Sequence, residues 1–156
     1  MININLFTLK KVFNYKILYP IKLISKHGDM MNVKEIMIEG VETIGEDETL
    51  DTALRKSTEE GEGGSLIVEN KGEVVGIVTT WDVLEAIGDE NQLNNTKVHD
   101  AMETHLVTVH TDTPVEEAAK EMVDHGIWRL PVEEAGQIVG IISATDILLN
   151  EIRNMM

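Results

Sequence analysis

The sequence of 156 residues predicts an α/β fold, of the mixed α+β kind, made of two β-α-β-β-α units packed by pseudo-twofold symmetry. The first observation is a repeat, because the stretch 76–82, GIVTTWD, returns 64 positions later as 140–146, GIISATD. The second is that shorter matches flank this stretch in the same order in both copies. The third is size, since a copy of about 55 residues buries little core alone, whereas two copies make a domain of ordinary size.

Apolar spacing and turn residues define the elements of the first copy. Thr49 stands where a helix N-cap is expected, and the helical spacing after it stops at Gly61. The residues Asn-Lys-Gly at 70–72 separate two β-branched runs and predict a hairpin. The predicted elements are a turn or short helix at 33–37, a strand at 41–44, a helix at 50–61, strands at 65–69 and 74–78, and a helix at 80–88.

The second copy repeats this order. Pro114 fits the first turn of its first helix, where a missing N–H costs nothing. Its predicted elements are an opening turn at 98–102, a strand at 107–109, a helix at 114–125, strands at 130–133 and 138–142, and a helix at 145–153. The predicted organisation is therefore a unit at 33–88, a short polar linker at 89–97 and a unit at 98–153, after an atypical basic segment at 1–30.

Charge is spread unevenly along the chain. The net charge is −15, yet residues 1–29 hold five lysines and one acid, so they carry +4 and the remainder carries −19. The strongly negative charge of residues 30–156 repels nucleic acid and anionic membranes, which argues against DNA or RNA binding by the repeats. No run of 18 apolar residues occurs, so we expect no membrane span.

The N-terminal segment 1–30 also holds every Phe and Tyr of the chain. Three interpretations compete: an amphipathic segment on a membrane surface, a signal peptide, or an upstream extension of the coding frame with Met30 or Met31 as the true start. The signal peptide is disfavoured, because the segment has no uninterrupted apolar stretch and no small-residue cleavage site. We favour the extension.

Catalytic and metal motifs find little support. Cysteine is absent, which excludes disulfides and thiolate metal sites and permits a cytoplasmic location. The five histidines form no HExxH pattern, and no phosphate-binding P-loop motif occurs, so we expect neither a metal site nor an enzyme. The acids Glu59-Glu60 and Glu116-Glu117 are interpreted as solvated helix faces.

The duplicated pattern resembles a tandem pair of cystathionine-β-synthase (CBS) domains, often called a Bateman module. A methionine stands in each opening turn, Met37 and Met102, and a Leu-x-Val strand follows at 66–68 and at 130–132. Both copies end on glycine-hydrophobic-x-Thr/Ser-x-x-Asp. The resemblance spans residues 33–152 and implies a stand-alone regulatory module that requires no cofactor, binds adenosine-containing ligands between its units, and forms a homodimer.

The shared ending motif suggests a phosphate and ribose site. Thr79 or Ser143 opens a helix whose free N–H groups and positive dipole end can receive a phosphate. Asp82 or Asp146, three residues on, could accept hydrogen bonds from both ribose hydroxyls, a use that the resemblance implies. The alternative is a purely structural role as a capping box, which stabilises a helix start without any ligand.

The resemblance also implies an adenine slot in each copy. It is formed by Val41 and Thr43 with Ser65 in the first copy, and by Val107 with Trp128 and Arg129 in the second. Trp128 could stack on a base or lie partly buried in the core. Arg129 could pair with a phosphate through its planar fork, or form a salt bridge to a nearby acid.

We therefore expect a sensor of AMP, ADP, ATP or S-adenosyl compounds that transmits a conformational signal to a separate protein partner. A chain so poor in basic residues favours AMP or a cationic S-adenosyl compound over ATP. The alternative is a ligand-free CBS dimerisation scaffold, in which the same residues only cap helices. An enzyme acting on nucleotides is a weaker third interpretation.

Overall fold

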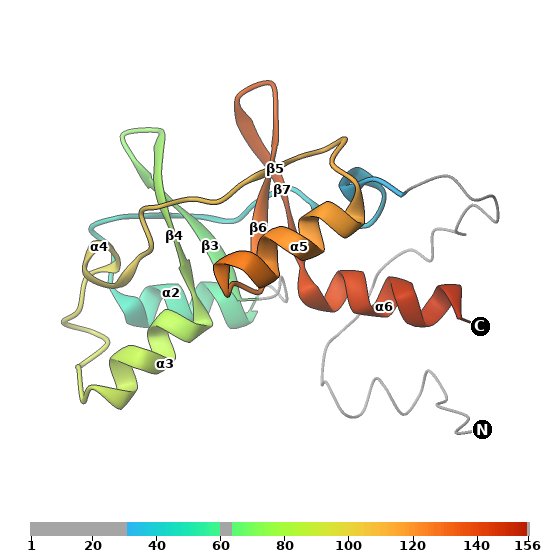
Figure 1. Ribbon diagram of the computed structural model, residues 1–156. Helices are drawn as coiled ribbons and strands as arrows, with labels where there is room; N and C mark the ends of the chain where they lie inside the picture. Colours follow the sequence, from blue (N-terminus) through green and yellow to red (C-terminus); the bar gives the residue numbers. More distant parts are fainter. Residues whose placement is uncertain (1–30, 60–63, 156) are drawn as a thin grey trace.

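The computed structural model describes residues 31–59 and 64–155 of the chain (Figure 1), so the basic segment 1–30 lies outside the described residues. The predicted α/β content is confirmed. The elements are η1 (Val33–Glu35), β1 (Ile38–Glu39), β2 (Thr43–Gly45), α2 (Leu50–Glu59), β3 (Ser65–Asn70), β4 (Glu73–Thr79), α3 (Thr80–Gly88), α4 (Val98–Ala101), β5 (Val109–His110), α5 (Val115–His125), β6 (Arg129–Glu134), β7 (Gln137–Ser143) and α6 (Ala144–Asn154).

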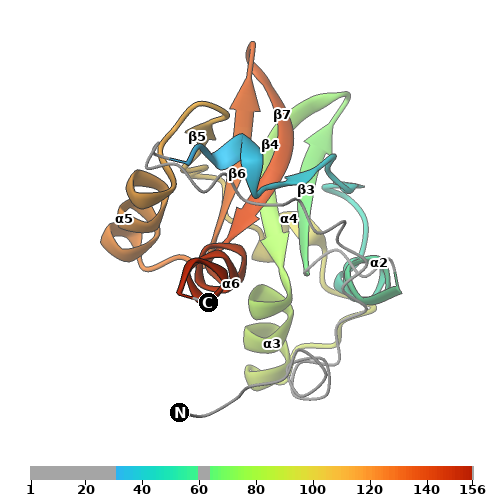
Figure 2. The same cartoon turned by 90° about the vertical axis from the view of Figure 1, so that its right-hand side faces the viewer.

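Two small sheets carry the repeat. In the first unit the strand order is β2-β3-β4, with β2 parallel and β4 antiparallel to β3. In the second unit β5 is parallel and β7 antiparallel to β6, in the order β1-β7-β6-β5. The hairpins β3–β4 and β6–β7 project in the same direction and lie side by side in both views (Figures 1 and 2). The two units thus share one internal plan.

Both hairpins turn through two residues in the left-handed region. Lys71 and Gly72 have φ values of 53° and 85°, and Ala135 and Gly136 have 53° and 76°. Positive φ at both central residues matches the right-handed twist of the strands, and glycine adopts it at the lowest cost. The first turn, together with a register shift between Val68 and Glu69, places Ser65 opposite Thr79.

The opening segment of each copy packs on the other unit. Strand β1, which the sequence did not predict, pairs with β7, and the Val33 amide donates to the Thr113 carbonyl at 2.8 Å. Reciprocally, the Val98 amide at the start of α4 donates to Glu48 O at 2.9 Å, and the Glu103 amide donates to Ile77 O at 2.9 Å. The two units are therefore interlocked by exchanged segments.

Two aliphatic cores follow the same exchange. Val33 is fully buried in the second core, packed with Leu130, Val132 and Ile142. Val98 is fully buried in the first core, which also holds Leu50 among its members. Each core is thus completed by the other copy's opening segment.

The helix termini agree with the sequence at most points. Thr49 accepts a hydrogen bond from the Thr52 amide at 3.3 Å before α2, as expected of a capping residue. Pro114 stands at the N-cap of α5 with ψ 141°, one residue before the first turn in which it was expected. Among residues 31–59 and 64–155, no helix is long and apolar enough to span a membrane.

Candidate functional site

Three strand ends meet at the same end of each sheet, and they carry the predicted residues. In the first unit β2 and β3 begin at Thr43 and Ser65, and β4 ends at Thr79 in register with Ser65. Val41 lies just before β2, and Asp82 lies in the first turn of α3. We call Val41, Thr43, Ser65, Thr79 and Asp82 the first candidate site.

The second unit repeats this arrangement with different side chains. Arg129 begins β6 in register with Ser143, which ends β7, and Asp146 lies in the first turn of α6. We call Val107, Trp128, Arg129, Ser143 and Asp146 the second candidate site. Val107 is half-buried and packs against the second core.

The first candidate site contains a complete capping box. Asp82 Oδ2 accepts hydrogen bonds from the Thr79 amide at 2.6 Å and from Thr79 Oγ1 at 2.8 Å. Thr79 Oγ1 in turn accepts from the Asp82 amide at 3.4 Å and from the Trp81 amide at 3.2 Å. These bonds use only one oxygen of the Asp82 carboxylate, so the box leaves Oδ1 outside it.

The second candidate site contains the matching box. Asp146 Oδ2 accepts from the Ser143 amide at 2.8 Å and from Ser143 Oγ at 2.6 Å, and the Asp146 amide donates to Ser143 Oγ at 3.2 Å. The capping interpretation therefore holds in both copies. It is compatible with ligand binding through the carboxylate oxygen that each box leaves outside it. The first N–H groups of α3 already have partners, because the Thr80 amide donates to Gly64 O and the next two amides donate to Thr79 Oγ1.

The two aspartates differ in their electrostatic surroundings. Burial raises the pKa of the Asp82 carboxyl above 3.8, against the hydrogen bonds from Thr79, and the charge of Glu85 raises it further. Burial also raises the pKa of the Asp146 carboxyl above 3.8, but there the charges of Arg129 and Arg153 act in the opposite direction. The first carboxylate thus has an acidic neighbour and the second has basic ones.

Ser65 has a buried hydroxyl without a partner. Its side chain is 7% exposed, and Oγ makes no hydrogen bond within the part of the chain that the structure describes. An unpaired buried hydroxyl costs free energy, so such a group usually marks a place that a ligand or a water molecule completes. Ser65 stands in register with Thr79, so this unsatisfied group lies at the N-terminal end of α3.

At each helix start, a residue before the middle strand lies next to the first residue of the helix, and the sizes of the two residues differ between the units. The Thr80 amide donates to Gly64 O at 2.9 Å, and the Ala144 amide donates to Trp128 O at the same distance. In the first unit a Cβ on Gly64 would lie 2.8 Å from Thr80 Oγ1, so the larger Thr80 is paired with a glycine. In the second unit the small Ala144 is paired with the large Trp128. Trp128 is 70% exposed, which excludes the core alternative and leaves its ring available for stacking.

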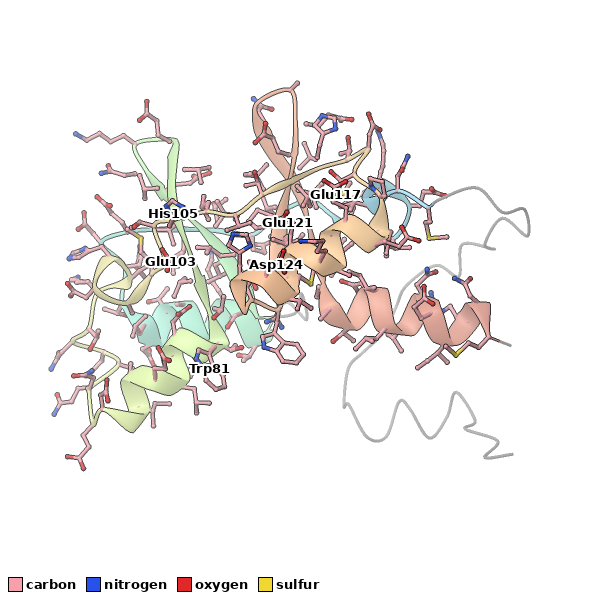
Figure 3. The ribbon with its side chains drawn as sticks, in the orientation of Figure 1. Trp81, Glu103, His105, Glu117, Glu121 and Asp124 are labelled. Carbon is pink, nitrogen blue, oxygen red and sulfur yellow. The ribbon has the colours of Figure 1, made fainter. Side chains whose placement is uncertain are left out.

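The first unit has an exposed tryptophan at a different position. Trp81 lies in the first turn of α3, 65% exposed, and its Nε1 donates to Glu85 Oε1 at 2.9 Å (Figure 3). The sequence predicted no role for it. One exposed indole thus lies near each candidate site, on α3 in the first unit and just before β6 in the second.

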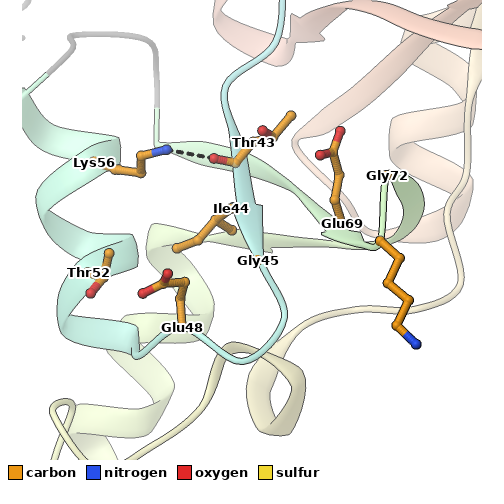
Figure 4. A pocket seen from close by; sticks show the side chains of 9 residues that line it. Thr43, Ile44, Gly45, Glu48, Thr52, Lys56, Glu69 and Gly72 are labelled. Carbon is orange, nitrogen blue, oxygen red and sulfur yellow. Dashed lines mark hydrogen bonds between the residues drawn. The ribbon is translucent and has the colours of Figure 1, made fainter.

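Lys56 is a basic residue that the sequence analysis missed. Its Nζ donates to Thr43 O at 2.8 Å from helix α2 (Figure 4). The sequence pattern that could have identified it is helical spacing, because Lys56 lies three residues after the buried Ala53 and therefore on the same face of α2. Lys56 lines a cavity of about 370 Å³, whose other members are Thr43, Ile44, Gly45, Glu48, Thr52, Glu69, Lys71 and Gly72.

A second cavity, of about 450 Å³, begins at Asp82 and runs along α3 toward α4. Four carboxylates line it together with small and amide side chains. Its members are Asp82, Glu85, Ala86, Asp89, Asn91, Asn95, Thr96, Asp100 and Ala101. The surroundings of the first candidate site are therefore strongly acidic on this side.

Gly76 and Gly140, the glycines of the shared ending motif, serve packing between the units rather than the approach of a ligand. A Cβ on Gly76 would lie 2.8 Å from Glu103 O and 2.9 Å from Met102 Sδ. On Gly140 it would lie 2.5 Å from Ile38 O and 3.0 Å from Met37 Sδ. The glycines make room for the exchanged opening segments, which also explains the methionine in each segment.

Metal ligands do not gather in the described part of the chain: residues 31–59 and 64–155 hold no group of three or more His, Asp or Glu side chains placed to bind an ion.

Comparison with known families agrees with the repeated fold. The family model for the CBS domain matches the chain twice, over residues 33–89 and 98–152. The chain belongs to the CBS domain family. CBS domain pairs are regulatory modules, and this chain carries one.

Similar CBS pairs occur in proteins of different kinds. The chain is 33% identical over 116 residues to a homoserine O-acetyltransferase of Methanococcus vannielii, covering 74% of this chain but only 24% of that relative. The CBS domain pair of protein MJ0100, solved in complex with 5′-methylthioadenosine and S-adenosylmethionine, superposes with a TM-score of 0.73 at 24% identity, covering 81% of this chain and 99% of that one. A hexameric CBS-CP12 protein from bloom-forming cyanobacteria has a TM-score of 0.75 at 28% identity, covering 83% and 77%.

Proposed function

We propose that this CBS pair senses adenosine-containing ligands, which bind at the two candidate sites and bias how the two units pack. The hydroxyl of Ser65 at the N-terminal end of α3, which is buried and has no partner among residues 31–59 and 64–155, carries the proposal. A ligand that donates to or accepts from Ser65 Oγ removes the cost of this unsatisfied group.

The chemistry of the surrounding groups suits a nucleoside. Asp82 and Asp146 each keep one carboxylate oxygen outside the capping box, and this oxygen can accept from ribose hydroxyls. Trp128 offers an exposed aromatic face to a purine. Protein MJ0100, which has the same fold, was solved with methylthioadenosine and S-adenosylmethionine, so the fold is able to hold such compounds.

The interlocked segments supply a route for the signal. Val41 and Thr43 lie directly after β1, which pairs with the second unit, while Thr43 itself belongs to the sheet of the first. A ligand that contacts this crossing segment favours one arrangement of the two units over others. We propose that a separate partner protein, in the cytoplasm, responds to this arrangement.

Replacement of the aspartates tests the sensor. Asp82→Ala and Asp146→Ala should each lower adenosine affinity at their own site at least roughly ten-fold, because the ribose hydroxyls lose a charged acceptor. Each should also cost about 1 kcal/mol of stability through the lost capping box. Isothermal titration measures the first effect and urea unfolding the second, with Asp124→Ala on α5 as the matched control. Lost stability with unchanged adenosine binding would favour the scaffold.

We further propose that the module is a homodimer held by α3 and α6. These equivalent helices expose apolar side chains at helical spacing, namely Trp81, Leu84 and Ile87 on α3 and Leu148 and Ile152 on α6, with Met155 directly after α6. Such faces are usually covered by a partner. Sedimentation equilibrium should show a dimer that Leu84→Lys combined with Leu148→Lys converts to a folded monomer. A wild-type monomer at high concentration would contradict this.

A further inference from the structure

We propose that the two candidate sites select adenosine ligands of different charge: the first an uncharged or cationic nucleoside, and the second a nucleoside that carries a phosphate. The inference rests on the proposed function, because it assigns a ligand class to each of the same two sites. The evidence for it comes from equivalent positions at which the two copies have different residues.

The decisive difference is at the start of the middle strand. Ser65 and Arg129 occupy equivalent positions, since each begins its strand in register with the N-cap residue, Thr79 or Ser143, of the following helix. A serine hydroxyl provides one neutral hydrogen bond, whereas a guanidinium provides a planar, permanently charged fork that fits phosphate. The repeat thus places a neutral group at one helix terminus and a cation at the other.

The charges along the two helices differ in the same sense. In α3 Glu85 lies one turn after Asp82, and Asp89 follows at the end of the helix. In α6 the position equivalent to Glu85 is Leu149, and Arg153 lies near the C-terminal end. The charge of Glu85 opposes ionisation of Asp82, whereas Arg129 and Arg153 favour that of Asp146. A phosphate is therefore repelled at the first site and attracted at the second.

The cavity that contains Asp82 strengthens this contrast. Its lining includes Glu85, Asp89 and Asp100 but no basic side chain. Several carboxylates around one cavity disfavour a dianionic group and favour a neutral thioether or a sulfonium cation.

Lys56 does not reverse the sign of the first site. Its ammonium group is held by the backbone carbonyl of Thr43, at the β2 edge of the first candidate site. The cavity that it lines also contains Glu48 and Glu69, which balance the charges of Lys56 and Lys71.

A further polar group distinguishes α6. Asn150 lies one turn after Asp146 on the same face, is 3% exposed, and has an Oδ1 without a hydrogen-bond partner among the described residues. The equivalent position in α3 is Ala86, which is buried and apolar. The second unit thus has the more polar interior beside its candidate site, which suits the more polar ligand.

The test compares two ligands that differ only at the 5′ position of the ribose, AMP and 5′-methylthioadenosine. Isothermal titration of the full chain should give one AMP per chain. Arg129→Ser should lower AMP affinity by roughly ten-fold or more and leave methylthioadenosine affinity within about two-fold. Ser65→Ala should do the reverse. Arg129→Lys should retain part of the AMP affinity, and Arg55→Ser, with the same change in net charge, should alter neither.

The outcomes separate the inference from the function on which it rests. If Arg129→Ser weakens both ligands equally, or neither, charge selection is refuted while adenosine sensing stands. If the wild-type chain binds neither ligand, the proposed function fails, and the inference with it. Thermal unfolding of each variant confirms that the changes in affinity come from folded protein.

Discussion

At the residue scale, one hydrogen-bonding pattern caps two helices and fixes the aspartates of the two proposed sites. Thr79 with Asp82, and Ser143 with Asp146, satisfy the first N–H groups of α3 and α6 and hold each aspartate at the start of its helix. The capping function fixes the side-chain positions before any ligand arrives. Such preorganisation lowers the entropy cost of binding.

The glycines of the repeated motif give a stability prediction. Gly76→Ala and Gly140→Ala should each destabilise the fold by about 1–3 kcal/mol, because the new methyl group overlaps a backbone carbonyl of the exchanged opening segment. Urea unfolding measures the change. Gly88→Ala is the control, since nothing lies within 4 Å of a Cβ there. Variants as stable as the control, but deficient in adenosine binding, would return these glycines to a ligand-contacting role.

The raised carboxyl pKa values give a pH prediction. The folded protein holds the protons of Asp82 and Asp146 more tightly than the unfolded chain does. The stability that they contribute is therefore fully present below 3.8 and is lost as pH rises through the raised folded pKa. Ribose hydroxyls that donate to these carboxylates favour the ionised form, so ligand binding should release protons in that window.

Titration calorimetry in two buffers of different ionisation enthalpy checks this directly. Adenosine affinity should rise as pH increases from 3.8 through the raised pKa, and the heat should depend on the buffer in the same range. Proton uptake on binding would show that the ligand stabilises the neutral carboxyl instead, which the ribose contact does not allow.

The sequence could predict which residues gather at the helix starts but not how their surroundings differ. The pairs Thr79–Asp82 and Ser143–Asp146 follow from local spacing alone, because a capping box spans three residues. The partner of Lys56, the exposure of Trp128 and the unpaired hydroxyl of Ser65 depend on tertiary packing. No local pattern specifies them.

At the scale of the elements, the exchange of opening segments is the main feature that the sequence did not predict. The hairpins and long helices follow from periodicity and turn residues. Strand β1 has two residues and shows no period, and its pairing with β7 joins residues about a hundred positions apart. The predicted units, 33–88 and 98–153, each include their own opening segment, whereas the backbone hydrogen bonds of Val33 and Val98 lead to the opposite unit.

Weakening the packing of one opening segment should therefore lower the local stability of the opposite unit. Val33→Ala should cost about 2 kcal/mol and reduce amide protection chiefly in β6 and β7, because Val33 is fully buried in the second core. Val98→Ala should do the same for β3 and β4. Hydrogen exchange measures both, and each variant is the control for the other. Loss of protection within the variant's own sequence repeat would contradict the exchange.

At the scale of the whole molecule, two similar units are locked together but are not equivalent. The same plan places a helix start, an aspartate and a strand start at one end of each sheet. Differences at single positions place an acidic neighbour, Glu85, beside Asp82 and basic neighbours, Arg129 and Arg153, beside Asp146. A pair built in this way can respond to two ligands through one common change of packing, because each opening segment belongs to both units.

The measurement that tests adenosine sensing most directly is a thermal-shift panel on the folded chain with AMP, ADP, ATP, S-adenosylmethionine, methylthioadenosine and NADH. A ligand at roughly 100 times its Kd adds about 2.7 kcal/mol of stability and should raise Tm by on the order of 10 °C. We predict such a shift for at least one adenosine compound and its loss in the double variant Asp82→Ala, Asp146→Ala. A folded chain whose Tm responds to none of them would contradict the sensor and favour the ligand-free scaffold.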